Sequence, residues 1–154
     1  MTLKAVLFTA LLAMAPVSEL RGAIPYALAQ DIPLWLLLPL CIAANMLPVP
    51  FIILFLRRLL AWFQKLGGFP RRLADWLIER GLKKSMIIKK YETLGLFILV
   101  AVPLPGTGAW TGALVAALVG LRMRFALPAI GAGVTAAGVI VALVCSGVLH
   151  IAGL

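Results

Sequence analysis

The stretch 94–121, LGLFILVAVPLPGTGAWTGALVAALVGL, decides the fold of this chain. It has no charged residue, yet ten of the fourteen Lys and Arg residues lie between Arg57 and Lys90, and two more follow at Arg122 and Arg124. One straight helix would be about 42 Å long, which exceeds a hydrocarbon core of ~30 Å, and it would put one basic end on the wrong side. The motif PLPG at 103–106 interrupts it. We therefore predict a re-entrant hairpin that enters the membrane and returns on the same side.

The composition is that of a membrane protein. The chain has 154 residues, of which 64% are apolar and 12% charged, so we predict one membrane domain over residues 1–154. Its formal charge of +9 lies beside apolar segments, where the positive-inside rule and anionic headgroups explain it. We therefore expect membrane lipids as partners, and no nucleic acid.

Groups for catalysis or metal binding are sparse. The chain has one histidine, His150, and lacks a phosphate-binding loop and a Ser-His-Asp pattern. We predict that the protein is not an enzyme and needs no metal and no cofactor.

Four apolar regions, 5–30, 33–56, 94–121 and 125–152, organise the chain. The second and fourth exceed the ~20 residues that a spanning helix needs. The first region resembles the third because it is interrupted between Pro16 and Gly22. Residues 1–15 also resemble a secretory signal peptide, but Pro16 is a poor residue after a cleavage point, so we keep them in the fold.

The two broken regions resemble each other. RGAIPYAL at 21–28 aligns with TGAWTGAL at 107–114 with Gly, Ala, Ala and Leu matching, and a proline-containing span follows each. We predict an all-α integral membrane fold with two repeats, each a re-entrant helical hairpin followed by a transmembrane helix. Repeat one covers 3–56, a basic amphipathic linker covers 57–92, and repeat two covers 93–154. With the linker in the cytoplasm, the repeats have opposite orientations in the inner membrane, an arrangement common in secondary transporters.

The linker itself contains a helix. GGFP at 67–70 separates two helical stretches, and the second mixes Leu73, Trp76 and Leu77 with many basic residues. This pattern is typical of a helix that lies on the membrane surface, and recruitment of a soluble partner is the alternative.

Glu19 and Arg21 lie in the middle of the first apolar region. A charge at the bilayer centre costs ~2.5–3.5 kcal/mol on insertion scales, so such groups are kept where they pair, face water or bind a ligand. Two positions apart, they point apart on a regular helix, but in an unwound tip both can face a cavity or the second hairpin. We predict that Arg21 attracts an anionic headgroup and that Glu19 carries a proton or neutralises the empty site. A mutual ion pair, or a position at the outer surface, is the alternative.

The segment PLPGTGAWTG at 103–112 leaves backbone groups without helical hydrogen bonds. The N-terminus of a half-helix at such a break presents N–H groups to an anion, although a tight turn for close helix packing is the alternative. The predicted substrate-binding residues of the first break are Glu19, Arg21, Gly22, Pro25 and Tyr26. Those of the second are Pro103, Pro105, Gly106, Thr107, Gly108, Trp110 and Thr111. We expect interhelical hydrogen bonds to account for Gln30 and Asn45, and they would also account for Tyr26.

The motifs SELRGAIP at 18–25 and PLPGTGAWTG resemble those of the small multi-drug export protein family, and the resemblance covers nearly the whole chain. Paired re-entrant hairpins resemble, more distantly, the DedA superfamily, which is associated with recycling polyprenyl-phosphate carriers. Glu19 and Arg21 match that pattern in the first hairpin, whereas the second hairpin lacks the arginine that the pattern places near its prolines.

We therefore predict a homodimeric transporter that moves an anionic amphiphile or lipid headgroup between the two hairpin tips. One alternative is a proton-coupled exporter of cationic drugs that uses Glu19. Another is a non-transporting scaffold that recruits partners through the linker.

Overall fold

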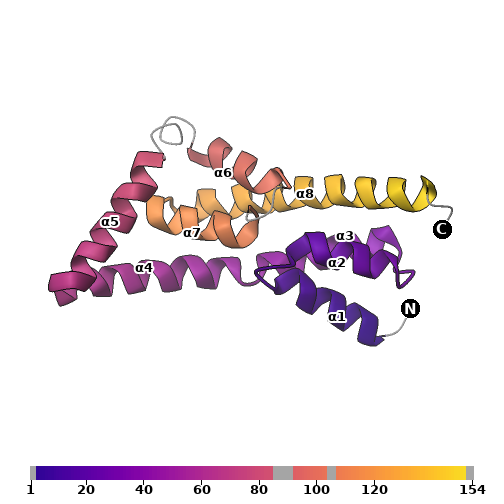
Figure 1. The fold of residues 1–154 in the computed structure, drawn as a ribbon, viewed down its shortest axis with the longest axis horizontal. Helices are drawn as coiled ribbons and strands as arrows, with labels where there is room; N and C mark the ends of the chain where they lie inside the picture. Colours follow the sequence, from indigo (N-terminus) through magenta and orange to yellow (C-terminus); the bar gives the residue numbers. More distant parts are fainter. Residues whose placement is uncertain (1–2, 85–91, 104–106, 152–154) are drawn as a thin grey trace.

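The computed structural model describes residues 3–84, 92–103 and 107–151, and all regular structure in these ranges is helical (Figure 1). The helices are α1 (Leu3–Met14), α2 (Glu19–Leu28), α3 (Leu34–Met46), α4 (Val49–Leu66), α5 (Gly68–Lys84), α6 (Glu92–Ala101), α7 (Ala109–Val119) and α8 (Met123–Ile151). The predicted all-α class is confirmed.

Two segments are long and apolar enough to cross a membrane. One is Leu34–Leu66, formed by α3 and α4, and the other is Met123–Gly147 within α8. Both lie along the long axis of the molecule (Figure 1). Prolines 39, 50 and 128 lie inside these helices and Pro48 lies between α3 and α4, where missing N–H groups bend helices without ending the span.

The other apolar helices form two pairs. In each pair, α1 with α2 and α6 with α7, the chain runs inward along one helix and back along the next (Figure 1). The first pair packs against α3 and the second against α8, and the pairs lie toward opposite ends of the molecule. The segment 94–121 is thus not one continuous helix, because helix α6 ends at Ala101 and α7 begins at Ala109.

The first break is shorter than predicted. Helix α1 ends at Met14 and α2 already begins at Glu19, so Arg21 and Gly22 belong to a helical turn instead of an unwound tip. Gly22 makes this possible, because a Cβ there would lie 2.7 Å from Ser18 Cβ. Glu19 has a left-handed backbone conformation, with φ of 45°, which glutamate adopts rarely. Its orientation therefore differs from that of a residue on a regular helix.

Small residues bring the second pair close to α8. The Val100 side chain of α6 lies between two glycines: a Cβ at Gly112 would lie 2.6 Å from Val100 Cγ2, and one at Gly133 would lie 2.7 Å from Val100 Cβ. Close approach through small residues is how helices associate in a bilayer, where lipid is as apolar as leucine.

Helix α4 continues to Leu66, through residues that the sequence analysis assigned to the linker. Leu60 is buried and continues the apolar face of the helix, which is why the helix does not end at the first basic residues. It ends before Gly67, whose φ of 69° suits glycine, and α5 then turns away from α4, as Figure 1 shows. The predicted separation of two helical stretches at GGFP is confirmed.

Candidate functional site

The two helix breaks meet, and we call this contact the junction. It consists of residues 14–21 of the first pair and residues 102, 103 and 107–110 of the second. Arg21 reaches across it: Nη2 donates to the backbone oxygen of Thr107 and, at 3.0 Å, to Thr107 Oγ1. The Thr107 hydroxyl in turn donates to the Val102 oxygen at 2.7 Å. The guanidinium group therefore satisfies carbonyl and hydroxyl oxygens that the break leaves outside the helices.

Glu19 crosses the junction in the complementary way. Its carboxylate accepts from the backbone N–H of Trp110 at 3.4 Å, and the residue is only 8% exposed. Trp110 lies in the first turn of α7, where backbone N–H groups have no helical acceptor and the helix dipole favours negative charge. The carboxylate therefore occupies the anion position that the sequence predicted for a substrate.

Gly108 makes room for this carboxylate. A Cβ at residue 108 would lie 1.8 Å from Glu19 Oε2 and 2.6 Å from Glu19 Cδ. No side chain can fit there while Glu19 keeps its position, so the glycine is a steric requirement of the junction.

Trp110 adds a third contact between the breaks. Its indole Nε1 donates to the Met14 oxygen at 3.0 Å, and Met14 is the last residue of α1. Trp110 thus joins the end of α1 to the start of α7: its backbone N–H binds Glu19 and its indole N–H binds Met14.

The C-terminal end of α7 is also held by the first half of the chain. Nη2 of Arg57, on α4, donates to the Leu121 oxygen just after α7, while Nε of Arg57 is buried without a partner. A carboxylate at the N-terminal end and a guanidinium at the C-terminal end both complement the dipole of this short helix. This role of Arg57 was not predicted from the sequence, because the residue was assigned to the linker. The signal in the sequence was that Arg57 is the first cation after the apolar region 33–56, a position from which it can still contact a neighbouring helix end.

A small cavity lies behind Glu19, with a volume of about 10 Å³. Its walls are Glu19, Leu20, Arg21, Asn45, Val100, Gly108, Ala109, Val134, Ala137 and Val141. Asn45 on α3 is 1% exposed, and neither its Oδ1 nor its Nδ2 has a hydrogen-bond partner. The expectation that interhelical hydrogen bonds account for Asn45 is therefore wrong.

A second, much larger hollow is an open apolar groove along α4, with a volume of about 730 Å³. The groove is lined by Leu47, Pro48, Phe51, Ile52, Leu54, Phe55, Arg58 and Trp110. It is thus apolar along its length, has a cation at Arg58, and reaches the junction at Trp110.

The remaining predicted residues of the first break lie apart from the junction contacts. Gly22 faces Ser18 within its own turn. Pro25 is exposed on α2, and the Tyr26 ring packs edge-on against the Phe8 ring of α1, with centroids 5.0 Å apart. Pro25 and Tyr26 line neither of the two hollows.

In the second break, Pro103 is exposed and Thr111 is half-buried in the first turn of α7. Pro105 and Gly106 lie outside the described residues. The structure therefore brings together five of the predicted residues: Glu19, Arg21, Thr107, Gly108 and Trp110.

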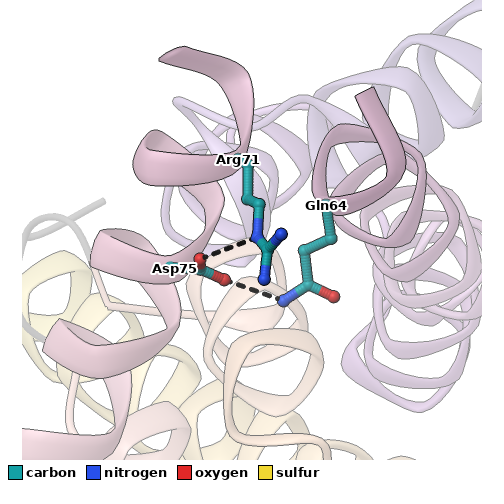
Figure 2. A network of polar contacts seen from close by, with 3 residues as sticks. All are labelled: Gln64, Arg71 and Asp75. Atoms are coloured by element: carbon teal, nitrogen blue, oxygen red, sulfur yellow. Dashed lines mark hydrogen bonds and ion pairs between the residues drawn. The ribbon is translucent and has the colours of Figure 1, made fainter. Parts of the chain in front are cut away.

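The basic linker helix is fixed to α4 by a polar network. Asp75 accepts a hydrogen bond from Gln64 Nε2 at 3.1 Å, and its other oxygen lies 3.8 Å from Arg71 Nε (Figure 2). The Arg71 and Asp75 side chains are 65% and 50% exposed and both belong to α5, so this ion pair stabilises α5 only weakly, and the Gln64–Asp75 hydrogen bond is the contact with α4. Helix α5 also contacts α7, which places the linker beside the second half.

Residues 19–140 match the family model described as "Putative small multi-drug export protein". The chain belongs to this family. The family match and the two apolar segments indicate a membrane protein with a role in export, a class that is generally not enzymatic. No curated protein and no solved structure matches the chain. The more distant resemblance to the DedA superfamily stays a prediction.

Proposed function

We propose that this member of the small multi-drug export family moves an anionic amphiphile or lipid headgroup across the inner membrane at the junction. Each helix pair is a re-entrant hairpin in this proposal, and the two repeats have opposite orientations with the linker in the cytoplasm. The lengths of the second pair support it. At ~1.5 Å per residue, α6 and α7 are each about 15 Å long, half of a ~30 Å hydrocarbon core.

One observation carries the substrate class: Trp110 belongs both to the wall of the apolar groove and to the junction. An amphiphile whose tail lies in the groove can therefore place its headgroup between the two breaks. Arg58 in the groove wall and Arg21 at the junction both favour a negative headgroup. A groove lined mostly by apolar side chains suits an acyl or aromatic tail.

The contacts at the junction suggest how an anion would be accepted. Arg21 now binds neutral oxygens of Thr107, and the α7 amide of Trp110 binds the Glu19 carboxylate. A headgroup anion would compete for both, because it offers Arg21 a full opposite charge in place of neutral Thr107 oxygens and offers the Trp110 amide an anion in place of Glu19. Displacing Glu19 and Arg21 from their partners would separate the two breaks and open a path between the repeats.

Transport by the purified full-length chain in vesicles tests this proposal. We expect faster movement of a fluorescent phosphatidylglycerol across the bilayer than of the phosphatidylcholine analogue with the same label. Arg21→Gln should remove at least nine-tenths of that difference. Arg124→Gln is the matched control, since Arg124 is exposed and stacks on its neighbour Phe125 at 4.8 Å. Equal rates for both lipids in the wild type, or equal loss in the two variants, would contradict the proposal.

Topology is tested by cysteine labelling. In a Cys41→Ala, Cys145→Ala background, Thr93→Cys and Arg122→Cys should react with an impermeant maleimide from the cytoplasmic side. Asp31→Cys should react from the opposite side. Labelling of positions 93 and 122 from opposite sides would rule out a re-entrant α6–α7 pair.

The family description names multi-drug export and so favours a drug exporter as the second candidate. In this chain it would be a proton-coupled exporter of cationic drugs with Glu19 as the binding carboxylate. Resistance of cells to a cationic dye such as ethidium separates the two. Loss with Glu19→Gln together with a gain with Arg21→Ala would favour cation export, because Arg21 would repel a cation. A scaffold role would instead require that both variants behave like the wild type while charge reversal of the linker abolishes function.

A further inference from the structure

Asn45 is the one described side chain whose polar atoms are all buried and unpartnered. It is 1% exposed, and neither the amide oxygen nor the amide nitrogen is hydrogen-bonded. Leaving such a group unsatisfied is costly, and native structures seldom do so without a bound water or ion. An apolar residue would fill this position at lower cost unless the amide serves a ligand.

The Asn45 amide borders the small cavity that Glu19 also lines. Its volume of about 10 Å³ is close to the minimum for a single water molecule, so no organic substrate fits. Glu19 and Arg21 are the two charged residues in its wall, and the wall residues from α3, α6, α7 and α8 are uncharged. Arg21 donates through Nη2 to Thr107. The groups in the cavity wall that can bind a cation are therefore the Glu19 carboxylate and the Asn45 amide oxygen.

We propose that this cavity binds one small cation between the Glu19 carboxylate and the Asn45 amide oxygen. The cation is a dehydrated sodium ion, or a proton that resides on the Glu19 carboxyl group and is linked to Asn45 through one internal water. Carboxylate and amide oxygens are the ligands that hard cations prefer, and either occupant has the size of the cavity. Binding also gives the Asn45 amide the partner that it lacks.

The role of this site in coupling rests on the proposed function. With Glu19 and Arg21 both charged, the empty junction is formally neutral. A bound cation makes it positive, which favours arrival of an anionic headgroup, and it weakens the hold of Glu19 on the Trp110 amide. By linkage, the anion must then raise the affinity for the cation by the same factor.

Binding of sodium alone is tested by thermal unfolding of the full-length chain in detergent. Melting temperatures are compared in sodium chloride and in choline chloride at equal ionic strength. If sodium is the occupant, the melting temperature of the wild type rises saturably with sodium, because a ligand that binds only the folded state stabilises it. Asn45→Leu and Glu19→Gln should abolish the rise, and Asn45→Asp, which adds a second carboxylate, should bind sodium at least tenfold more tightly.

The proton is tested in sodium-free buffer by following the infrared carboxyl band that Glu19→Gln removes. If a proton on Glu19 is the occupant, Asn45→Leu should change the proton affinity of Glu19 at least tenfold, because the internal water that joins the two groups loses its amide partner. Cys41→Ala is the control for both measurements, since Cys41 is buried one turn earlier on α3 and does not line the cavity. It should leave the response unchanged.

A sodium response that depends on Asn45 identifies sodium, and a titration that depends on Asn45 identifies the proton. If the wild type shows neither, or if Cys41→Ala alters the response as much as Asn45→Leu, the proposal is overturned. Asn45→Asp keeps the test decisive if Asn45→Leu does not fold. None of these measurements includes an anionic amphiphile when the detergent is non-ionic, so failure of anionic transport would leave this result standing, and the reverse also holds.

Discussion

The α1–α2 pair and the α6–α7 pair both break where they meet, but they bring different groups to the contact. The first pair supplies two charged side chains, Glu19 and Arg21, whereas the second supplies only uncharged groups: the backbone and hydroxyl oxygens of Thr107 and the amide and indole N–H groups of Trp110. Charges in only one of the two pairs suffice at this contact, because the end of a broken helix offers a partial charge of the opposite sign. The contact therefore needs no arginine near the prolines of the α6–α7 pair.

The two pairs also differ in how closely they approach α8. A Cβ at Gly133 would lie 2.7 Å from Val100 Cβ and 3.0 Å from the Phe97 backbone oxygen, both on α6. A Cβ at Gly138 would have ordinary contacts of 3.7–3.9 Å, including the Leu20 side chain of α2. At these positions the second pair therefore approaches α8 more closely than the first pair does.

The largest effect should follow from closing the space that Gly108 leaves for Glu19. We expect Gly108→Val to destabilise the protein by about 2–4 kcal/mol and to abolish transport, since overpacking is combined with a displaced, buried carboxylate. Thermal unfolding in detergent and the vesicle assay measure this. Gly147→Ala, where a Cβ meets nothing within 4 Å, is the control. Normal transport by Gly108→Val would show that the groups of the two pairs need not meet.

The difference in packing is tested by a matched pair of variants on α8. Gly133→Ala should cost about 1–3 kcal/mol, because the backbone of α6 must shift to accommodate the methyl group. Gly138→Ala should stay within about 0.5 kcal/mol of the wild type or stabilise it slightly, since alanine favours helix over glycine. Unfolding curves of both variants give the comparison. Equal destabilisation would mean that both pairs pack on α8 equally closely.

A smaller effect is expected for Trp110→Phe, which keeps an aromatic ring but removes the hydrogen bond to the Met14 oxygen. The loss should be about 0.5–1.5 kcal/mol, the usual range for one hydrogen bond. Because Trp110 also lines the groove, the apparent affinity for the labelled lipid should change as well. Trp62→Phe, at an exposed position of α4, is the control, and a larger loss in that variant would contradict the assigned contact.

The smallest effect should come from the linker. Asp75→Asn breaks an exposed ion pair and should change stability by less than about 0.5 kcal/mol, with no change in lipid movement. Unfolding and transport measurements on the same preparation check this. A transport defect here would move the functional site away from the junction and toward the α4–α5 contact.

The breaks themselves could be predicted from the sequence, because prolines and glycines end helices for local reasons. PLPG at 103–106 predicted the interruption that separates α6 from α7, and two intramembrane charges predicted that Glu19 and Arg21 have partners. The identity of those partners was out of reach. Each lies about ninety residues away, and nothing in a local pattern says which carbonyl or amide a side chain will contact.

Two further features could not be predicted for a related reason. The conformation of Glu19 is set by its contact with the second pair, since a positive φ is unfavourable for glutamate in isolation. Whether the Asn45 amide finds a hydrogen-bond partner depends on all the residues that surround it in the fold, and these are far apart in the sequence. The extension of α4 to Leu66 was not predicted because the first basic residues were assumed to end the apolar span. Arg57 instead stays within the helix and donates to the Leu121 oxygen at the end of α7.

Helix α7 has a consequence for any attempt to divide the molecule. Its two ends are closed by Glu19 and Arg57, and both belong to the other half of the chain. A fragment that contains only the second half would leave the ends of α7 without the Glu19 carboxylate and the Arg57 guanidinium, and one that contains only the first half would leave those side chains without the α7 groups that they bind. Neither half should therefore fold on its own as it does in the intact chain.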